Sequence, residues 1–282
     1  MKMALGLRQS VTITLAQLMF LVAPVHSSTQ STAVSISTPE QIKAEFDSVP
    51  CKNEERLGAA KALFEKIGVP AADTSIDKYK NVENLVVRKP GASQEIIVIG
   101  AHYDKVAEGC GAVDNWTGIV TLAQLYKSLK NVPLRKTILF VAFGKEEKGL
   151  VGSNAMVDAI GKDQVAQYCE MINIESFGLA VPQVADNMSS KRLGAFTVDL
   201  AKELKIPFNH ASIAGADADS SSFLRKKIPA ITLHGLNNDW TSILHSRNDQ
   251  ASKINPLSVY LGYRLVLALV VRLDSLPCGE YR

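Results

Sequence analysis

The sequence predicts an α/β fold: a single-domain, mixed, mainly parallel β-sheet flanked by helices on both faces. Three observations support this prediction. Apolar and β-branched runs at 95–100, 136–143, 171–174 and 228–234 are typical of strands buried on both faces. Segments with helical spacing separate these runs, and such alternation favours parallel pairing of the strands. No repeat or long linker divides the chain after its first forty residues, so we expect one domain over residues 40–282.

The remaining elements follow from local patterns. Residues 39–67 show helical periodicity. Residues 84–88 form a β-branched run that is separated from the run at 95–100 by Lys-Pro-Gly-Ala, a turn signal that predicts a hairpin. Further helices are expected at 118–129, 154–160, 192–204 and 257–276. The last of these is strongly apolar, but three charged side chains interrupt it, which favours a core helix over a membrane span.

Composition excludes several classes of protein. The chain has 282 residues, of which 46% are hydrophobic and 21% charged, and this excludes a disordered, collagenous or coiled-coil protein. The formal net charge is +3, and the only basic cluster is Arg-Lys-Lys at 225–227. We therefore expect no nucleic acid partner, because the sequence lacks the basic surface that such binding needs.

The first residues have the layout of an export signal. Residues 1–27 combine a short basic start, an apolar stretch and small residues before a cleavage point, which predicts a secretory signal peptide. Residues 28–39 are rich in Ser and Thr and are interpreted as a flexible lead-in. No cysteine follows the apolar stretch, so no membrane anchor is expected. These features predict a secreted or periplasmic protein with a mature net charge of +1, because the discarded segment holds Lys2 and Arg8.

The cysteines form an even set: Cys51, Cys110, Cys169 and Cys278. Export to an oxidising compartment favours two disulfides, for which three pairings are possible. We favour Cys51 with Cys278 and Cys110 with Cys169, because the first pair would tie both ends of the domain together. The alternative is four buried thiols. No two cysteines have the close spacing of a zinc cluster.

Polar side chains follow the predicted strands at their carboxyl ends. His102 and Asp104 follow the first strand, Asp114 and Asn115 precede the next helix, Glu146 and Glu147 follow the second strand, Glu175 ends the third, and His245 follows the fourth. Any one of them has an ordinary structural explanation. Because the carboxyl ends of parallel strands meet at one edge of the sheet, we expect these groups to converge there. Their joint placement predicts a functional site.

These residues carry a family resemblance. The segments 101–104, 111–118, 146–153, 173–178, 218–223 and 245–249 resemble, in this order, the signature blocks of the M28 family of zinc peptidases. The likeness spans roughly residues 80–255. That family contains secreted aminopeptidases, glutamate carboxypeptidases and a glutaminyl cyclase branch. The resemblance implies a zinc exopeptidase-like (phosphorylase/hydrolase-like) fold and peptide substrates.

The resemblance also implies a role for each matching residue. His102 and Glu175 would bind one zinc, Glu147 and His245 a second, Asp114 would bridge the two ions, and Glu146 would be the catalytic general base. Nitrogen and oxygen ligands suit zinc. Two metals about 3.5–4 Å apart need a shared carboxylate, a role that suits a short aspartate. Peptide hydrolysis would then proceed through a metal-activated water whose proton passes to Glu146 and on to the leaving amine.

Five further residues are expected around the ligands: Asp104, Asn115, Trp116, Trp240 and Asp249. The two aspartates would orient His102 and His245 through their second ring nitrogens, although turn or surface positions are equally good interpretations. Relatives often hold a cis peptide bond at the position of Asn115. The two tryptophans would line an apolar substrate pocket or pack in the core.

Two departures from the family pattern stand out. Glu175 occupies a position where most relatives have aspartate, so a single-metal enzyme is an alternative to the two-zinc site. The block at 218–220 reads Ala-Asp-Ser where relatives commonly have Ser-Asp-His. His210 and His234 are assigned to structure.

The most specific expectation is aminopeptidase activity. An acidic site suits a protonated α-amine better than a terminal carboxylate, for which a carboxypeptidase would want an arginine. Arg247 is the only arginine close to a proposed ligand in the sequence. Glutaminyl-peptide cyclase-like or carboxypeptidase activity on the same scaffold are the alternatives. A non-catalytic binding protein is disfavoured because all five ligand positions and Glu146 are intact.

Overall fold

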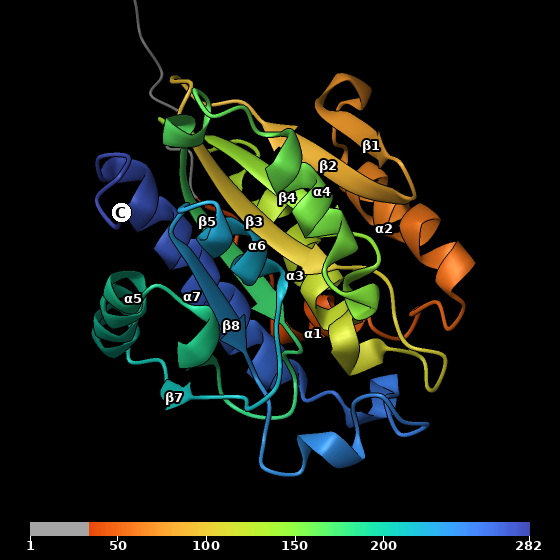
Figure 1. Cartoon of the computed structure of the whole chain (residues 1–282). Coiled ribbons are helices and arrows are strands. Elements are labelled where there is room, and N and C mark those ends of the chain that lie inside the picture. The colour runs from red at the N-terminus through yellow and green to blue at the C-terminus, as the bar shows by residue number, and fades with distance from the viewer. Residues whose placement is uncertain (1–33) are drawn as a thin grey trace, which may run out of the picture. The chain divides into compact units, whose positions relative to one another are not determined.

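An eight-stranded sheet runs through the part of the chain that the computed structural model describes, residues 34–282 (Figure 1). The predicted signal peptide lies outside the described residues. The strands are β1 (Thr74–Tyr79), β2 (Val82–Lys89), β3 (Ile96–His102), β4 (Thr137–Phe143), β5 (Tyr168–Glu175), β6 (Gln183–Ala185), β7 (Asn209–Ala211) and β8 (Ala230–His234). Their order in the sheet is β1-β2-β4-β3-β5-β8-β6-β7. β3 pairs in parallel with β4 and β5, and β5 pairs in parallel with β8.

Helices cover both faces of this sheet, which confirms the predicted α/β class. They are α1 (Pro39–Lys43), α2 (Asn53–Ile67), α3 (Thr117–Leu129), α4 (Val151–Ala159), α5 (Lys191–Glu203), α6 (Asp219–Arg225) and α7 (Pro256–Ser275). Successive strand side chains point to opposite faces, so Leu85 and Val87 pack with α1, α2, α3, α5 and α7. Val86, between them, packs in the smaller core beneath α4 and α6. α4 and α6 lie on the side of the sheet nearer the viewer in Figure 1.

The predicted hairpin between residues 84–88 and 95–100 is wrong, because β4 lies between the two strands. β2 pairs antiparallel with β4, and β3 pairs with the other edge of β4. The Lys-Pro-Gly-Ala segment instead passes around the start of β4, where the amide of Ala92 donates to the carbonyl oxygen of Leu134 at 3.0 Å. A side chain on Gly91 would clash with the backbone of Lys136. The antiparallel partner of β2 along the chain is β1, which the sequence analysis did not predict.

The helical segment predicted at 39–67 consists of two helices. α1 and α2 are separated by residues 44–52, which include Pro50, a residue that cannot donate a helical hydrogen bond. Ser37, in the predicted lead-in, is already buried, and its hydroxyl donates to Gln124 at 2.6 Å. α7 has the length and apolar composition of a membrane span, but its inner face packs against α1, α3 and α5 as a core helix.

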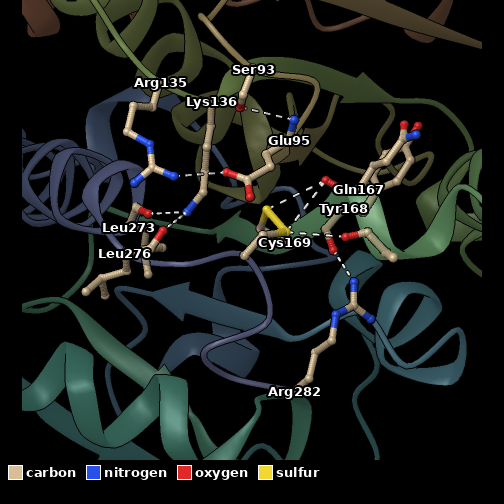
Figure 2. The surroundings of a disulfide bond; sticks show 12 residues. Ser93, Glu95, Arg135, Lys136, Gln167, Tyr168, Cys169, Leu273, Leu276 and Arg282 are labelled. Atoms are coloured by element: carbon tan, nitrogen blue, oxygen red, sulfur yellow. Dashed lines mark hydrogen bonds and ion pairs between the residues drawn. A yellow bond between two sulfur atoms is a disulfide. The ribbon is translucent and has the colours of Figure 1, made fainter.

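The two disulfides join Cys51 to Cys110 and Cys169 to Cys278, so the pairing favoured from the sequence is wrong. Cys51 precedes α2 and lies beside the loop that follows β3. Cys278 follows α7, which ends near the start of β5. Figure 2 shows the second disulfide: the ammonium group of Lys136 donates to the carbonyl of Leu276 at 2.7 Å, and a guanidinium nitrogen of Arg282 donates to the carbonyl of Tyr168 at 2.6 Å.

Candidate metal centre

Five potential metal ligands meet at the carboxyl edge of the central strands. His102 ends β3, Glu175 ends β5, Glu147 lies in the turn after β4, His245 lies in the loop after β8, and Asp114 lies just before α3. The structure brings together the five residues that the sequence predicted as ligands, and Glu146 lies beside them. This happens because parallel pairing of β3, β4, β5 and β8 aligns their carboxyl ends.

Asp114 stands between two groups of ligands. Its Oδ1 lies 3.1 Å from Nε2 of His102, and its Oδ2 lies 3.1 Å from Nε2 of His245. Glu175 completes the first group, with Oε1 3.3 Å from the His102 nitrogen. Glu147 completes the second, with Oε2 3.2 Å from the His245 nitrogen. One carboxylate therefore faces two separate donor sets, which is the arrangement that two bridged metal ions require.

The spacing and hydrogen bonding of the donor atoms suit a bound cation. Within each group the potential ligand atoms all lie within 4.8 Å of one another. Oε1 of Glu147 is buried and has no hydrogen-bond partner among residues 34–282. A buried, unpartnered carboxylate oxygen is costly, and a bound cation would satisfy it. Imidazole nitrogen and carboxylate oxygen together are a zinc-type donor set.

The electrostatics of the cluster also favour an added positive charge. Burial, helped by the nearby carboxylates of Asp219, Glu175 and Asp114, raises the pKa of Glu146 to about 10 against the opposing effect of His102. Hydrogen bonds to Asp114 and Glu147 raise the pKa of His245 to about 10. Without a metal, the cluster therefore retains protons that balance its own negative charge.

Asp104 holds the turn that carries the proposed base. Its Oδ1 accepts from the backbone amide of Glu146 at 2.9 Å, and its Oδ2 accepts from the amide of Glu147 at 3.2 Å. Nδ1 of His102 lies 3.0 Å from the backbone carbonyl oxygen of Asp104 and 3.7 Å from its carboxylate, so the closer contact of this ring is with the backbone of Asp104. Asp104 therefore holds the backbone of Glu146 and Glu147 with its carboxylate, while its own carbonyl faces His102.

Asp249 has a similar role on the other side of the centre. Its Oδ1 accepts from the amide of Val113 at 2.7 Å, and its Oδ2 accepts from the amide of Asp114 at 3.2 Å. The carboxylate thus faces the backbone that carries Asp114 and not the ring of His245, which corrects the sequence expectation. Hydrogen bonds from backbone amides to a charged carboxylate are strong, so these two bonds fix the position of the backbone that carries Asp114.

Asn115 connects the backbone next to Asp114 to the neighbouring strand β5. The Asp114–Asn115 peptide bond is cis, the form that the family resemblance implied. The side-chain oxygen of Asn115 accepts from the amides of Gly118 and Ser176, both at 3.1 Å. Its side-chain nitrogen donates to the carbonyl of Ile174 at 2.8 Å. These bonds join the start of α3 to the end of β5.

A cavity of about 620 Å³ opens onto the ligands. Its apolar lining comes from Met188, Ile213, Leu236, Trp240 and Leu244. Asn154, Asp217 and Arg225 form a polar part of the lining. Trp240 therefore takes the pocket position expected of it, whereas Trp116 is 1% exposed and belongs to the core. Arg225, and not Arg247, is the arginine that lines the cavity.

Two buried charged residues near the centre, Asp219 and Arg56, were not among the predicted site residues. Asp219, at the start of α6, is fully buried, and its carboxylate raises the pKa of Glu146. The Ala-Asp-Ser block marked its position, but only as a departure from the family pattern. Arg56 of α2 is also fully buried, and an isolated arginine in a helix gave no signal. Of the histidines assigned to structure, His234 is buried in β8 and His210 pairs with Asp186 at 2.9 Å on the surface.

Comparisons with known proteins agree with this geometry. Among curated proteins, aminopeptidase YwaD of Bacillus subtilis is 37% identical over 103 residues, which cover 36% of this chain and 21% of that protein. Aminopeptidase Y of Saccharomyces cerevisiae is 30% identical over 117 residues, which cover 41% of this chain and 22% of that protein. The chain thus spans less than a quarter of the length of these relatives.

Solved structures share the fold. LapB from Legionella pneumophila has a TM-score of 0.72 at 21% identity, with 89% of this chain and 76% of LapB covered. A glutaminyl cyclase from an Acidobacteriales bacterium has a TM-score of 0.71 at 16% identity, with 85% and 96% covered. A sequence model of Peptidase family M28 matches residues 84–270, a segment that contains the five candidate ligands and Glu146. The chain belongs to Peptidase family M28.

Proposed function

We propose that this protein is a zinc-dependent exopeptidase, an aminopeptidase that releases N-terminal residues from peptides. The observation that carries the proposal is the position of Asp114, whose two carboxylate oxygens each lie 3.1 Å from a different histidine. His102, Asp114 and Glu175 would hold one zinc ion, and Asp114, Glu147 and His245 the other. The curated relatives named as aminopeptidases support the same activity.

Glu146 is the proposed general base. Zinc bound at this centre would supply a Lewis acid that polarises the scissile carbonyl and makes water more acidic. Oε2 of Glu146 lies 4.0 Å from Nε2 of His102, at the border of the first ligand group but outside its closest contacts. From there the carboxylate would take a proton from water and return it to the leaving amine. Asp104, by fixing the amide of Glu146, holds this carboxylate in place.

The cavity supports N-terminal cleavage of peptides that begin with an apolar residue. Carboxylates around the metal ligands suit a protonated α-amine. The apolar lining suits an aliphatic or aromatic side chain, because burial of such a side chain stabilises the complex by about 1.5–3 kcal/mol. The lining residues for this side chain are Met188, Ile213, Leu236, Trp240 and Leu244.

Two alternatives each have one observation in their favour. Arg225 lines the cavity and offers a guanidinium for a C-terminal carboxylate, which favours a carboxypeptidase. Trp240 in the lining offers an aromatic wall for glutaminyl-peptide cyclisation. Arg225→Ala would abolish hydrolysis in the first case, whereas an aminopeptidase should retain its activity on an aminoacyl anilide.

We also propose that the protein works outside the cytoplasm, in secreted or periplasmic form. The two disulfides support this, because such bonds persist in oxidising compartments. Expression of the full chain, followed by N-terminal sequencing of the exported form, tests the predicted cleavage after residue 27. Recovery of uncleaved protein in the cytoplasm would contradict this part of the proposal.

The activity is tested with matched substrates. Leucine anilide and a peptide with an N-terminal leucine should be hydrolysed. The N-acetylated forms of both, which lack the free α-amine, should not be hydrolysed. A peptide that begins with glutamine is assayed for cyclisation, which tests the cyclase alternative. Peptides with a free or an amidated C-terminus are compared as substrates, which tests the carboxypeptidase alternative. Chelation should remove the activity, and zinc should restore it. A zinc-loaded, folded protein that hydrolyses none of these substrates would overturn the proposal.

A further inference from the structure

We propose that Arg56 is a positioning residue for the metal centre, and that it acts with Cys51 and Asn53 as a clamp on the loop 103–111. This inference rests on the proposed function of the centre. The clamp residues lie before the segment 84–270 that matches the family, so they are a feature of this chain outside its family-matched part. The loop that they hold joins His102 to the segment that carries Asp114.

Arg56 binds both ends of this loop. Its side chain is fully buried, and its Nε donates to the carbonyl oxygen of Tyr103 at the start of the loop. At the end of the loop, Nη1 donates to the carbonyl of Cys110 at 2.8 Å, and Nη2 donates to the carbonyl of Gly111 at 3.0 Å. A planar guanidinium with fixed donor directions can join these points, whereas a lysine ammonium cannot reproduce the same fork.

The side chain of Arg56 also contacts Trp116, which follows Asp114 by two residues in the sequence. The guanidinium carbon of Arg56 lies 5.1 Å from the centroid of the Trp116 ring, close enough for a cation–π interaction. The carbonyl oxygen of Gly111, which accepts from Arg56, also accepts from the amide of Trp116 at 3.2 Å. Arg56 therefore holds the backbone on both sides of Asp114.

Two neighbours of Arg56 in sequence attach to the same loop. Cys51 is bonded to Cys110. The side-chain amide nitrogen of Asn53 donates to the carbonyl of Lys105 at 2.7 Å, and its oxygen accepts from the amide of Lys105 at 2.9 Å. Three side chains within six residues thus fix the loop at its start, its middle and its end.

Close packing leaves the loop little freedom to adjust. Gly111 has φ +58°, and a Cβ at this residue would lie 2.8 Å from the carbonyl oxygen of Asp114 and 3.2 Å from Nη1 of Arg56. Loss of the guanidinium would leave the carbonyls of Cys110 and Gly111 without this partner. We expect the backbone from Cys110 to Asp114 to shift in response, because the three hydrogen bonds from Arg56 to the loop are lost while only the disulfide and the Asn53 bonds remain.

The positive charge of Arg56 supports this arrangement. Burial lowers the pKa of Arg56 to about 10, and four carboxylates around the centre act in the opposite direction: Asp114, Asp104, Asp249 and Glu147. Arg56 is therefore charged at neutral pH and lies within the field of the acidic cluster. It forms no ion pair within 4.0 Å among residues 34–282. Its donors instead go to backbone carbonyls, three in the loop and a fourth at Pro50, to which Nη1 donates at 3.0 Å.

The test compares Arg56→Lys and Arg56→Met with the wild-type full chain. Zinc affinity is measured by chelator competition, and the cobalt-substituted protein gives a ligand-field spectrum that reports the geometry of the centre. We expect both variants to lose about 10–100-fold in zinc affinity, the range found for groups that orient metal ligands. Lysine keeps the charge but not the fork, so its failure to restore affinity would identify the hydrogen-bond geometry as the cause.

The matched control is Lys136→Met. Lys136 is also fully buried and also donates to backbone carbonyls, those of Leu273 and Leu276, but it lies at the start of β4, away from the centre. This variant should lower the melting temperature while zinc affinity and the cobalt spectrum remain those of the wild type. If the Arg56 variants behave in the same way, Arg56 is only structural and the proposal is overturned.

The disulfides provide a second, independent pair. Cys51→Ser/Cys110→Ser should weaken zinc binding, whereas Cys169→Ser/Cys278→Ser should not, although each variant loses one disulfide. If Arg56→Met does not fold, the two double cysteine variants and Arg56→Lys still test whether the clamp positions the metal centre. Equal zinc affinity in the two double variants would contradict the clamp. A wild-type protein that binds no zinc would instead refute the proposed function.

Discussion

The carboxylate of Asp104 accepts a hydrogen bond of 2.9 Å from the backbone amide of Glu146. Asp104 follows the ligand His102 by two residues, and its backbone carbonyl lies 3.0 Å from Nδ1 of that histidine. One short segment after β3 therefore contacts the proposed metal ligand His102 through its backbone and the backbone amide of the proposed base Glu146 through its side chain. Asp104 thus links the proposed base to the first proposed metal position.

Replacement of Asp104 by Asn should lower kcat while most of the bound metal is retained. The backbone carbonyl that faces His102 remains, whereas one carboxylate oxygen is replaced by an amide group that cannot accept from a backbone amide. An unsatisfied buried group costs about 1–3 kcal/mol, so we expect a loss of about 10–100-fold in kcat. Steady-state kinetics and elemental analysis check this. Asp199→Asn, at an exposed position, is the control and should leave both values unchanged.

Replacement of Glu146 by Gln should separate metal binding from catalysis. Glutamine is similar in size but cannot accept the proton from water. We expect a decrease in kcat of about a hundredfold to ten-thousandfold, with zinc retained at the wild-type level. Single-turnover assays on leucine anilide and a zinc count on the same sample provide the measurement. Near-wild-type hydrolysis by this variant would mean that another group is the base.

The positions of the ligands could be predicted because two simple rules coincide. Strands buried on both faces form continuous apolar runs, and in a parallel sheet the residues after such runs share one edge. His102 and Glu175 lie at the ends of β3 and β5, so their convergence followed from the strand prediction alone. Asp114 was expected at the same edge because it precedes a helix, but its position between two groups of candidate ligands was implied only by the family resemblance.

The parts that were wrong or missed depend on contacts distant in sequence. A turn signal predicts that the chain reverses, but it does not determine that β4 lies between β2 and β3. The partner of Cys51 depends on where the loop after β3 lies relative to α2, which no local pattern encodes. For the same reason Arg56 gave no signal: its carbonyl partners at Tyr103 and beyond are about fifty residues away.

The metal-free protein should become less stable as the pH rises. The pKa of His245 is raised to about 10 from its usual 6.5, mainly by its hydrogen bond with Asp114, so the stability that it contributes is complete below pH 6.5 and is lost towards pH 10. The pKa of Glu146 is raised to about 10 by burial and changes stability in the same direction. Thermal unfolding of chelator-treated protein from pH 6 to pH 10 checks this.

Zinc should remove this pH dependence and release protons as it binds. Because His245 is protonated in the metal-free protein at neutral pH, coordination must displace that proton. Titration calorimetry at pH 7.5 in buffers of different ionisation enthalpy measures the number released, and we expect about one or more per centre. An equal heat in all buffers would contradict the proposed role of His245. His210→Asn, on the surface, should leave the released protons unchanged.

Replacement of Glu170 by Gln should stabilise the protein above pH 7. Glu170 follows Cys169 in β5 and is fully buried. Its two carboxylate oxygens have no hydrogen-bond partner among residues 34–282. Burial raises its pKa to about 7, and the opposing charges of Lys136 and Arg282 do not cancel this effect.

The raised pKa means that the folded state holds the Glu170 proton more tightly than the unfolded state. Ionisation of Glu170 therefore costs no stability below about pH 4.5, and this cost grows until the pH exceeds 7. We expect Glu170→Gln to unfold at a higher temperature than the wild type at pH 8, with a gain of about 1–3 kcal/mol in the free energy of unfolding. At pH 4.5 the two proteins should differ little. Calorimetric melts at both pH values, with activity as a control, check this, and a loss of stability at pH 8 would show that the carboxylate is paired.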